Sequence, residues 1–254
     1  MLKLGIDVGA GNTKAAIMDD GRVLAVAGVT TGFDQKESAE TAIGQALQKA
    51  GKTMKDISRI RATGVGRKAI PDITTEEIDE FTSAAKGALF FLPSARTVID
   101  VGAEEGRAVK IDSTGKILDF AVNEKCAAGA GAFVDAMAKA LEVPSAEELG
   151  KISLQATKKI PMNAQCVVFA ESEVVSLIAT ATEKADISKA IHDSIADRIG
   201  GMSRRAGLEK DVALIGGVAK NVGFVESLKK SLNMDILVPT DPEYVSAVGA
   251  AVSA

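Results

Sequence analysis

The sequence contains few tryptophan, tyrosine, histidine and cysteine residues. Its 254 residues include no tryptophan, one tyrosine and one histidine, so Ala, Val, Ile and Leu must form most of the core. Two cysteines are too few for a disulfide framework. Net charge is −4 and the isoelectric point is about 5.3, without the basic excess expected of a nucleic-acid-binding protein. We therefore expect no nucleic-acid partner.

Long apolar runs are also missing. The run over residues 84–92 is interrupted by Lys86 and is too short to cross a bilayer. The amino-terminal "MLKLGIDVG" reaches Asp7 before any apolar core of a secretory signal could form. From the sequence we expect a cytoplasmic protein that does not bind membranes.

Two familiar nucleotide motifs fail. No G-x-x-x-x-G-K-[ST] is present, so there is no P-loop. "GVGRKA" over residues 64–69 fits the dinucleotide pattern G-x-G-x-x-A. Pro71 follows at once, however, and excludes a long helix with its amino terminus on a pyrophosphate.

The sequence does contain an internal repeat. "IDVGA" occurs at residues 6–10 and again at 99–103. Each copy ends an apolar strand and is followed by a short turn, an alternating strand, a hairpin turn with Asp and Gly, and a third strand. The second and third strands are expected over residues 15–18 and 23–27 in the first copy, and 108–111 and 117–122 in the second. Two copies predict two related halves, residues 1–94 and 95–254.

Helices and further strands follow each meander. Helices are predicted over residues 38–50, 75–90, 131–141, 146–154, 170–180, 187–206, 222–232 and 242–251. Strands are predicted over residues 57–62, 211–215 and 235–238. The fold class is therefore α/β, with two halves that each join a meander to a mixed sheet flanked by helices. A ligand is expected in the cleft between the halves.

The repeated Asp-Val-Gly turns are candidate phosphate sites. Glycine lets the backbone approach an anion, and the free amides of a tight turn point at it. Asp7 and Asp100 then stand at the strand ends, as hard oxygen ligands for Mg²⁺, and Lys14 adds a cation. Ordinary hairpin turns with buried glycines are the alternative. Retention of the aspartate in both copies favours phosphate binding.

A third glycine site follows a later strand. "LIGGVAKN", residues 214–221, places Gly216 and Gly217 between a strand and a helix. In a two-lobed cleft this turn would face the nucleoside. Alone it is a weak signal, and beside the repeated turns it completes a set.

The two cysteines, Cys126 and Cys166, are isolated rather than paired in CxxC. A [4Fe–4S] cluster normally needs four thiolates, so one such chain cannot hold a cluster but two together can. Cys126 also precedes a predicted helix, whose amino terminus favours a thiolate. Spacing alone nevertheless favours two buried, inert thiols.

Together these motifs carry a family resemblance. "ATGVGR", "NEKCAAGAGAF", "CVVFAESEV" and "GGVAKN" occur in order across nearly the whole chain, about residues 3–252. They resemble the ATPase family that activates 2-hydroxyacyl-CoA dehydratases and forms the ATP-hydrolysing subunits of benzoyl-CoA reductases. That family belongs to the sugar kinase, Hsp70 and actin superfamily. The resemblance therefore implies two ribonuclease-H-like (actin-like) halves around an ATP cleft.

The resemblance implies a function as well. An ATPase of this kind drives electrons at low potential into an acyl-CoA reductase or a dehydratase component. It would receive them from a ferredoxin or flavodoxin, and would share one [4Fe–4S] cluster with a second subunit, identical or homologous. The implied cofactors are ATP, Mg²⁺ and that cluster. By position the cluster ligands are Cys126 and Cys166, the catalytic residues are Asp7, Asp100 and Glu104, and the nucleotide contacts are Gly9, Asn12, Thr13, Lys14, Gly102, Gly216, Gly217 and Asn221.

The chain departs from the family pattern in two turns. Ala10 stands where activators usually carry a hydroxyl residue, so Asn12 or Thr13 would have to supply that phosphate contact. Residues 103–105 read Ala-Glu-Glu in place of Gly-Gln-Asp, and Glu104 could orient the attacking water or act as base. Both changes favour a reductase-type subunit. A small-molecule kinase of the same superfamily, without a cluster, is the alternative.

Two other residues receive weaker interpretations. His192, the single histidine, is expected to be a surface or hydrogen-bonded residue without a catalytic role. For Arg67 three interpretations stay open, namely an internal structural role, contact with a partner surface, or contact with a phosphate.

Overall fold

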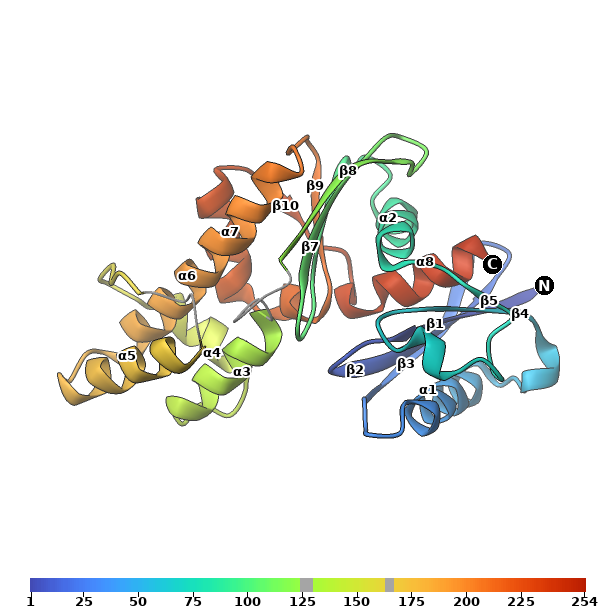
Figure 1. Cartoon of the computed structure of the whole chain (residues 1–254), viewed down its shortest axis with the longest axis horizontal. Coiled ribbons are helices and arrows are strands. Elements are labelled where there is room, and N and C mark those ends of the chain that lie inside the picture. The colour runs from blue at the N-terminus through green and yellow to red at the C-terminus, as the bar shows by residue number, and fades with distance from the viewer. Residues whose placement is uncertain (124–129, 163–166) are drawn as a thin grey trace.

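The computed structural model describes residues 1–123, 130–162 and 167–254 of the chain. Two five-stranded mixed sheets form two lobes (Figure 1). The first sheet has the order β3-β2-β1-β4-β5, in which β1, β2 and β3 form an antiparallel meander and β4 and β5 join in parallel. Its strands are β1 (Leu2–Val8), β2 (Asn12–Asp19), β3 (Arg22–Thr30), β4 (Ile57–Thr63) and β5 (Glu76–Glu77).

The second sheet repeats this topology. Its order is β10-β9-β6-β7-β8, again an antiparallel meander with two strands added in parallel. Its strands are β6 (Thr97–Val101), β7 (Gly106–Ile111), β8 (Ile117–Asn123), β9 (Val212–Ile215) and β10 (Ile236–Leu237). The internal repeat in the sequence therefore corresponds to two copies of one sheet.

The hairpin turns follow from their residues. Between β2 and β3 the loop is Asp20 and Gly21, with φ of 41° and 79°. Two consecutive positive φ angles are characteristic of a type I′ turn, whose twist matches the strands it joins. In the second hairpin the Asp112 carboxylate accepts bonds from the backbone of Thr114 and Lys116, which closes the turn. Both predicted hairpins are confirmed.

Helices cover both faces of each sheet. On the first sheet, α1 (Gln35–Ala50) packs Ala39, Ala42 and Ile43 against the buried face. Asp34 caps its first turn, and Gly51 ends it in the left-handed conformation. In the second lobe the main helical layer consists of α3 (Ala130–Ala140), α4 (Ala146–Ser153), α5 (Val167–Ala179), α6 (Lys184–Arg205) and α7 (Val222–Leu232).

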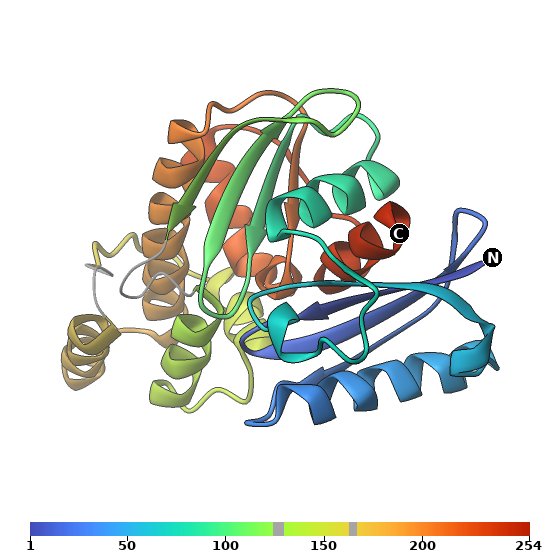
Figure 2. The same ribbon diagram turned by 45° about the vertical axis from the view of Figure 1, so that its right-hand side comes forward.

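Two helices lie between the lobes (Figure 2). α2 (Glu80–Phe91) follows the first sheet in sequence but packs its alanines with Val98, Val109 and Ile215 of the second. α8 (Val245–Ser253), at the end of the chain, packs with Ala16 and Met18 of the first sheet. Each lobe therefore contributes one helix that packs against the sheet of the other lobe. A division between residues 94 and 95 separates the strands of the first sheet from those of the second. As a domain boundary it stays a prediction.

α2 and α8 also approach each other closely. A Cβ added at Gly87 would lie 2.0 Å from the Val245 carbonyl oxygen, and one at Gly249 would lie 1.8 Å from that of Ser83. Only glycine permits such contact between helix backbones. A tightly packed helix pair therefore forms part of the contact between the lobes.

Two predicted helices begin too early. The helix expected over residues 75–90 starts at Glu80, because Glu76 and Glu77 add to β4 as a short parallel strand and Asp79 caps the helix. The helix expected over residues 242–251 begins with a 3-10 turn, Pro242–Tyr244, before α8. Within the described residues, no helix is both long and apolar enough to cross a membrane.

Candidate functional site: a cleft between two repeated turns

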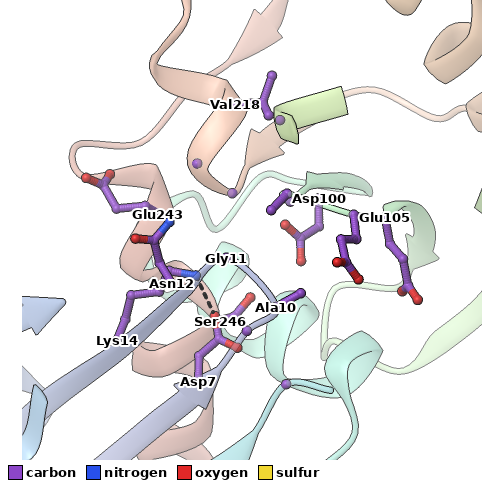
Figure 3. A pocket seen from close by; sticks show the side chains of 18 of the residues that line it. Asp7, Ala10, Gly11, Asn12, Lys14, Asp100, Glu105, Val218, Glu243 and Ser246 are labelled. Atoms are coloured by element: carbon purple, nitrogen blue, oxygen red, sulfur yellow. Dashed lines mark hydrogen bonds and ion pairs between the residues drawn. The ribbon is translucent and has the colours of Figure 1, made fainter. Parts of the chain in front are cut away.

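A cleft of about 440 Å³ lies between the two lobes. It is lined by the turns that follow β1 and β6, by the end of β4 and by the turn after β9. Figure 3 shows Asp7, Ala10 and Lys14 from the first lobe and Asp100 and Glu105 from the second. Of the residues predicted to contact nucleotide or act in catalysis, the lining includes Asp7, Gly9, Asn12, Lys14, Asp100, Gly102, Glu104, Gly216, Gly217 and Asn221.

The two strand-end turns have the same backbone geometry. The amide of Gly9 donates to the Asn12 carbonyl at 3.2 Å, and that of Gly102 donates to the Glu105 carbonyl at 2.9 Å. The turns also touch across the cleft, because a Cβ on Gly11 would lie 2.7 Å from the Ala103 Cβ. The repeat therefore places two equivalent turns face to face, as the sequence predicted.

Two glycines outside the repeated motif complete this symmetry. Gly64 follows β4 with φ of 88°, and Gly216 follows β9 with φ of 90°. A Cβ on Gly64 would lie 2.5 Å from the Asp7 carboxylate, and one on Gly216 would lie 2.6 Å from that of Asp100. Both positions require glycine for conformation and for space. The sequence motifs indicated Gly216 as a nucleoside contact and gave no sign of Gly64 as its counterpart.

Each aspartate faces a cation on the adjacent strand. Asp7 is opposite Lys14 in the β1–β2 pair, and their charged groups are 3.2 Å apart. Asp100 is opposite Arg107 in the β6–β7 pair, at 3.8 Å. Burial raises the pKa of the Asp100 carboxyl, and the positive charge of Arg107 opposes that rise. The cleft thus holds paired carboxylates and cations where the two repeated turns meet.

Two predicted contacts have structural roles. Thr13 is fully buried and is not among the cleft residues, because its hydroxyl bonds that of Thr31 beneath the first turn at 2.9 Å. Asn221 lines the cleft, but its side chain caps α7 through the Phe224 amide and donates to the Ala146 carbonyl. Of the two substitutes for a hydroxyl at Ala10, Asn12 is therefore the one that reaches the cleft.

Several cleft residues had no signal in the sequence motifs. They include Glu80 at the start of α2, Arg107 on β7, and Glu243, whose carboxylate lies 3.0 Å from the charged group of Lys220. Aligning the two repeats would have identified Arg107, since it occupies the place of Lys14. Nothing in the sequence brings Glu80 to the cleft, because that depends on how α2 crosses between the lobes.

Arg67 and His192 have internal partners. The guanidinium of Arg67 donates to the Gly64 carbonyl and to Glu80, at 2.9 and 3.0 Å. His192 is fully buried in α6, and its Nδ1 bonds the Ser188 carbonyl at 2.6 Å. Burial lowers the pKa of His192 to about 4, so the ring is neutral at physiological pH. The expectation of a hydrogen-bonded residue holds for the histidine.

The second turn is joined to the start of α3. The amides of Gly131 and Ala132 donate to the carbonyls of Gly102 and Ala103, at 3.1 and 3.0 Å. A Cβ on Gly131 would lie 2.9 Å from the Ala103 Cα, so only glycine permits this contact without a shift. The turn and the first turn of α3 are therefore bonded directly.

Both cysteines, Cys126 and Cys166, lie outside the described residues. Among the described residues, no group of three or more His, Cys, Asp or Glu side chains is arranged to hold a metal ion. A divalent cation at Asp7 and Asp100 would need further oxygens from a ligand and water, which is how Mg²⁺ is usually held beside phosphates.

The fold and the cleft define a class of protein, the two-lobed proteins of actin-like and sugar-kinase-like fold. Glucokinase of the ROK family from Streptomyces griseus shares this architecture at a TM-score of 0.63 and 18% identity, which reflects the fold alone. A family model assigns the chain more narrowly. Residues 4–254 match the BadF/BadG/BcrA/BcrD ATPase family, and the chain belongs to it.

Relatives support this assignment over full length. The chain is 40% identical to the activator of lactoyl-CoA dehydratase of Anaerotignum propionicum, covering 100% of this chain and 97% of that protein. It is 30% identical to a benzoyl-CoA reductase subunit of Thauera aromatica, covering 97% and 90%. In structure it matches the activator of 2-hydroxyisocaproyl-CoA dehydratase from Clostridium difficile with bound ADPNP, at a TM-score of 0.94, 34% identity, and coverage of 100% and 94%.

The similarities include relatives of both subtypes, so the choice between a dehydratase activator and a reductase-type subunit stays a prediction. Ala10 and the Ala-Glu-Glu of residues 103–105 favoured a reductase-type subunit, yet identity is higher to the dehydratase activator than to the reductase protein. Four substitutions in two turns carry less information about subtype than the whole chain does.

Proposed function

We propose that the protein is an ATP-hydrolysing electron-transfer subunit that activates a 2-hydroxyacyl-CoA dehydratase. The observation that carries the proposal is the pair of equivalent turns, each with an aspartate and a facing cation, closed across one cleft. Binding of ADPNP by the Clostridium difficile activator, which has the same fold over the whole chain, supports a nucleotide as the occupant.

Under this proposal the turn amides and Lys14 bind the phosphates. Asp7 and Asp100, from opposite lobes, hold Mg²⁺ together with phosphate oxygens and water. The exposed Glu104 beside the second turn orients or deprotonates the attacking water. Gly216 and Gly217 leave room for the nucleoside.

We further propose that Cys126 and Cys166 hold a [4Fe–4S] cluster shared with a second subunit, identical or homologous. The cluster supplies one-electron storage at low potential. Support comes from α5, which begins directly after Cys166 and carries the exposed apolar side chains Phe169, Val175 and Ile178. Exposed apolar side chains of this size suit contact with another protein. The electron would come from a ferredoxin or flavodoxin and pass to the dehydratase component.

The two parts of the proposal are tested together by anaerobic purification. We expect about two irons and two sulfides per chain, a dimeric mass, and Mg-ATP hydrolysis. Cys126→Ser and Cys166→Ser should each lose iron while retaining ATP binding. A metal-free monomer that transfers phosphate from ATP to a small acceptor would instead establish the alternative, a kinase of the same superfamily.

A further inference from the structure

An ion-pair network links the two lobes at the phosphate end of the cleft. Glu80, the first residue of α2, lies between two arginines. Its carboxylate accepts from Arg67 of the first lobe at 3.0 Å and lies 3.7 Å from Arg107 of β7 in the second lobe. Glu80 therefore connects the segment after β4 in the first lobe to strand β7 in the second lobe.

Arg107 has the same place in the second lobe as Lys14 in the first. Each is opposite an aspartate in the equivalent antiparallel pair, and each lines the cleft. Arg107 differs in its surroundings, because three carboxylates from three segments face it. They are Glu105 at 2.5 Å, Glu80 at 3.7 Å and Asp100 at 3.8 Å.

The three distances show that Arg107 contacts Glu105 closely and the other two carboxylates only loosely. The bond to Glu105 is a close charge-assisted hydrogen bond, whereas the Glu80 and Asp100 distances exceed hydrogen-bonding range. A guanidinium has five N–H donors in a planar fork, so Arg107 can keep Glu105 and still direct donors to another anion. Glu80 keeps its hydrogen bond to Arg67 in that event, so its carboxylate retains a cation partner.

Charge in the cleft makes such a donor necessary. Five carboxylates line the phosphate end, from Asp7, Glu80, Asp100, Glu104 and Glu105. The cations beside them in that part of the lining are Lys14 and Arg107. A polyphosphate entering this field is repelled unless cations offset the carboxylates, and each added phosphate increases the demand.

We propose that Arg107 binds the terminal phosphate of the nucleotide and that Glu80 competes with that phosphate for it. Without a terminal phosphate, Glu80 holds Arg107 toward α2 and, through Arg67, joins the lobes. With the terminal phosphate present, Arg107 turns to it and the Glu80 contact is released. Arg107 is then a catalytic residue that discriminates triphosphate from diphosphate, and Glu80 is a positioning residue. This inference rests on the proposed function, since it presumes a nucleotide in the cleft.

The test compares binding of Mg-ADPNP and Mg-ADP by calorimetry in the full-length protein. Arg107→Gln should weaken ADPNP binding about 30-fold, the effect of losing a charge-assisted bond, and ADP binding less than about threefold. Arg107→Lys should recover part of the lost affinity. Glu80→Gln should tighten ADPNP binding about threefold and leave ADP unchanged, because the competing charge is gone. A purely structural Glu80 would not improve binding when changed.

Lys110→Gln is the matched control. Lys110 lies on the same strand, pairs with Glu209 at 3.2 Å and is not among the cleft residues, so neither nucleotide should be affected. Thermal unfolding of each variant verifies folding. Equal weakening of both nucleotides by Arg107→Gln, or no weakening, overturns the inference while the proposed function stands. Failure of the wild-type protein to bind either nucleotide overturns the proposed function.

Discussion

Substitution of Gly131 tests whether the second turn and α3 act as one unit. In Gly131→Ala the new Cβ would lie 2.9 Å from the Ala103 Cα and from the Gly102 carbonyl oxygen. Both neighbours are backbone, so the helix or the turn must move by about half an ångström to reach ordinary contact. That movement lengthens the two bonds from Gly131 and Ala132 to the turn, which are 3.1 and 3.0 Å.

The energetic effect can be estimated by comparison of opposing terms. Overpacking costs about 1–3 kcal/mol, and weakening two backbone hydrogen bonds adds about 1 kcal/mol. Alanine in place of glycine within a helix offsets about 1 kcal/mol. We expect a net loss of about 2 kcal/mol in the free energy of unfolding. We also expect about tenfold weaker Mg-ATP binding, because under the proposed function the amides of the displaced turn bind the phosphates.

Urea unfolding and nucleotide calorimetry measure these effects. Gly201→Ala is the matched control, since Gly201 is also a helical glycine, in α6, but a Cβ there meets nothing within 4 Å. The control should gain up to about 1 kcal/mol in stability and bind nucleotide normally. If Gly131→Ala behaves like Gly201→Ala in both assays, the turn and α3 are not mechanically joined and the reasoning fails.

Three other substitutions test the glycine at the second strand end, the buried histidine and the first cleft cation. Gly216→Ala should lose more than about 2 kcal/mol of stability, because φ there is 90° and the added Cβ would lie 2.6 Å from the Asp100 carboxylate. Gly217→Ala places its Cβ in open space and should lose little, and equal losses in urea unfolding would contradict this account. The pKa of His192 is about 4 in the folded protein, below its value in the unfolded chain. Its contribution to the free energy of unfolding is therefore complete above about pH 6.5 and falls by about 3 kcal/mol as the pH falls toward 4. In His192→Gln this part of the acid dependence should disappear, and an unchanged pH profile would refute it. Lys14→Gln should weaken Mg-ATP binding at least tenfold in calorimetry, because Lys14 lines the cleft beside the first turn and is proposed to bind the phosphates. Unchanged affinity would exclude that role.

Much of the fold was predictable because it is repeated. "IDVGA" at two positions identified both strand ends and both turns, and glycine and aspartate chemistry predicted the hairpins between them. α7 was predicted at its observed bounds, residues 222–232, since Asn221 and Asn233 mark its two ends. Turn and cap residues act within a few residues of chain, so tertiary packing does not alter what they predict.

What the sequence did not predict depends on tertiary packing. Glu76 and Glu77 resemble the start of a helix, but pairing with β4 makes them a strand. Glu80 reaches the cleft because α2 crosses to the second sheet, and that crossing rests on the contact of Gly87 with the α8 backbone. Thr13 looked like a phosphate contact because it follows the turn, yet strand alternation directs it inward to Thr31.

The central claim is that nucleotide in this cleft controls electron delivery to a partner. The most direct measurement reduces the anaerobically purified protein, mixes it with an oxidised 2-hydroxyacyl-CoA dehydratase component, and follows electron transfer spectroscopically with Mg-ATP or Mg-ADP. We predict transfer with ATP, little or none with ADP, and loss of transfer in Cys126→Ser and Cys166→Ser. Transfer at equal rates with ATP, with ADP and without nucleotide would contradict the account.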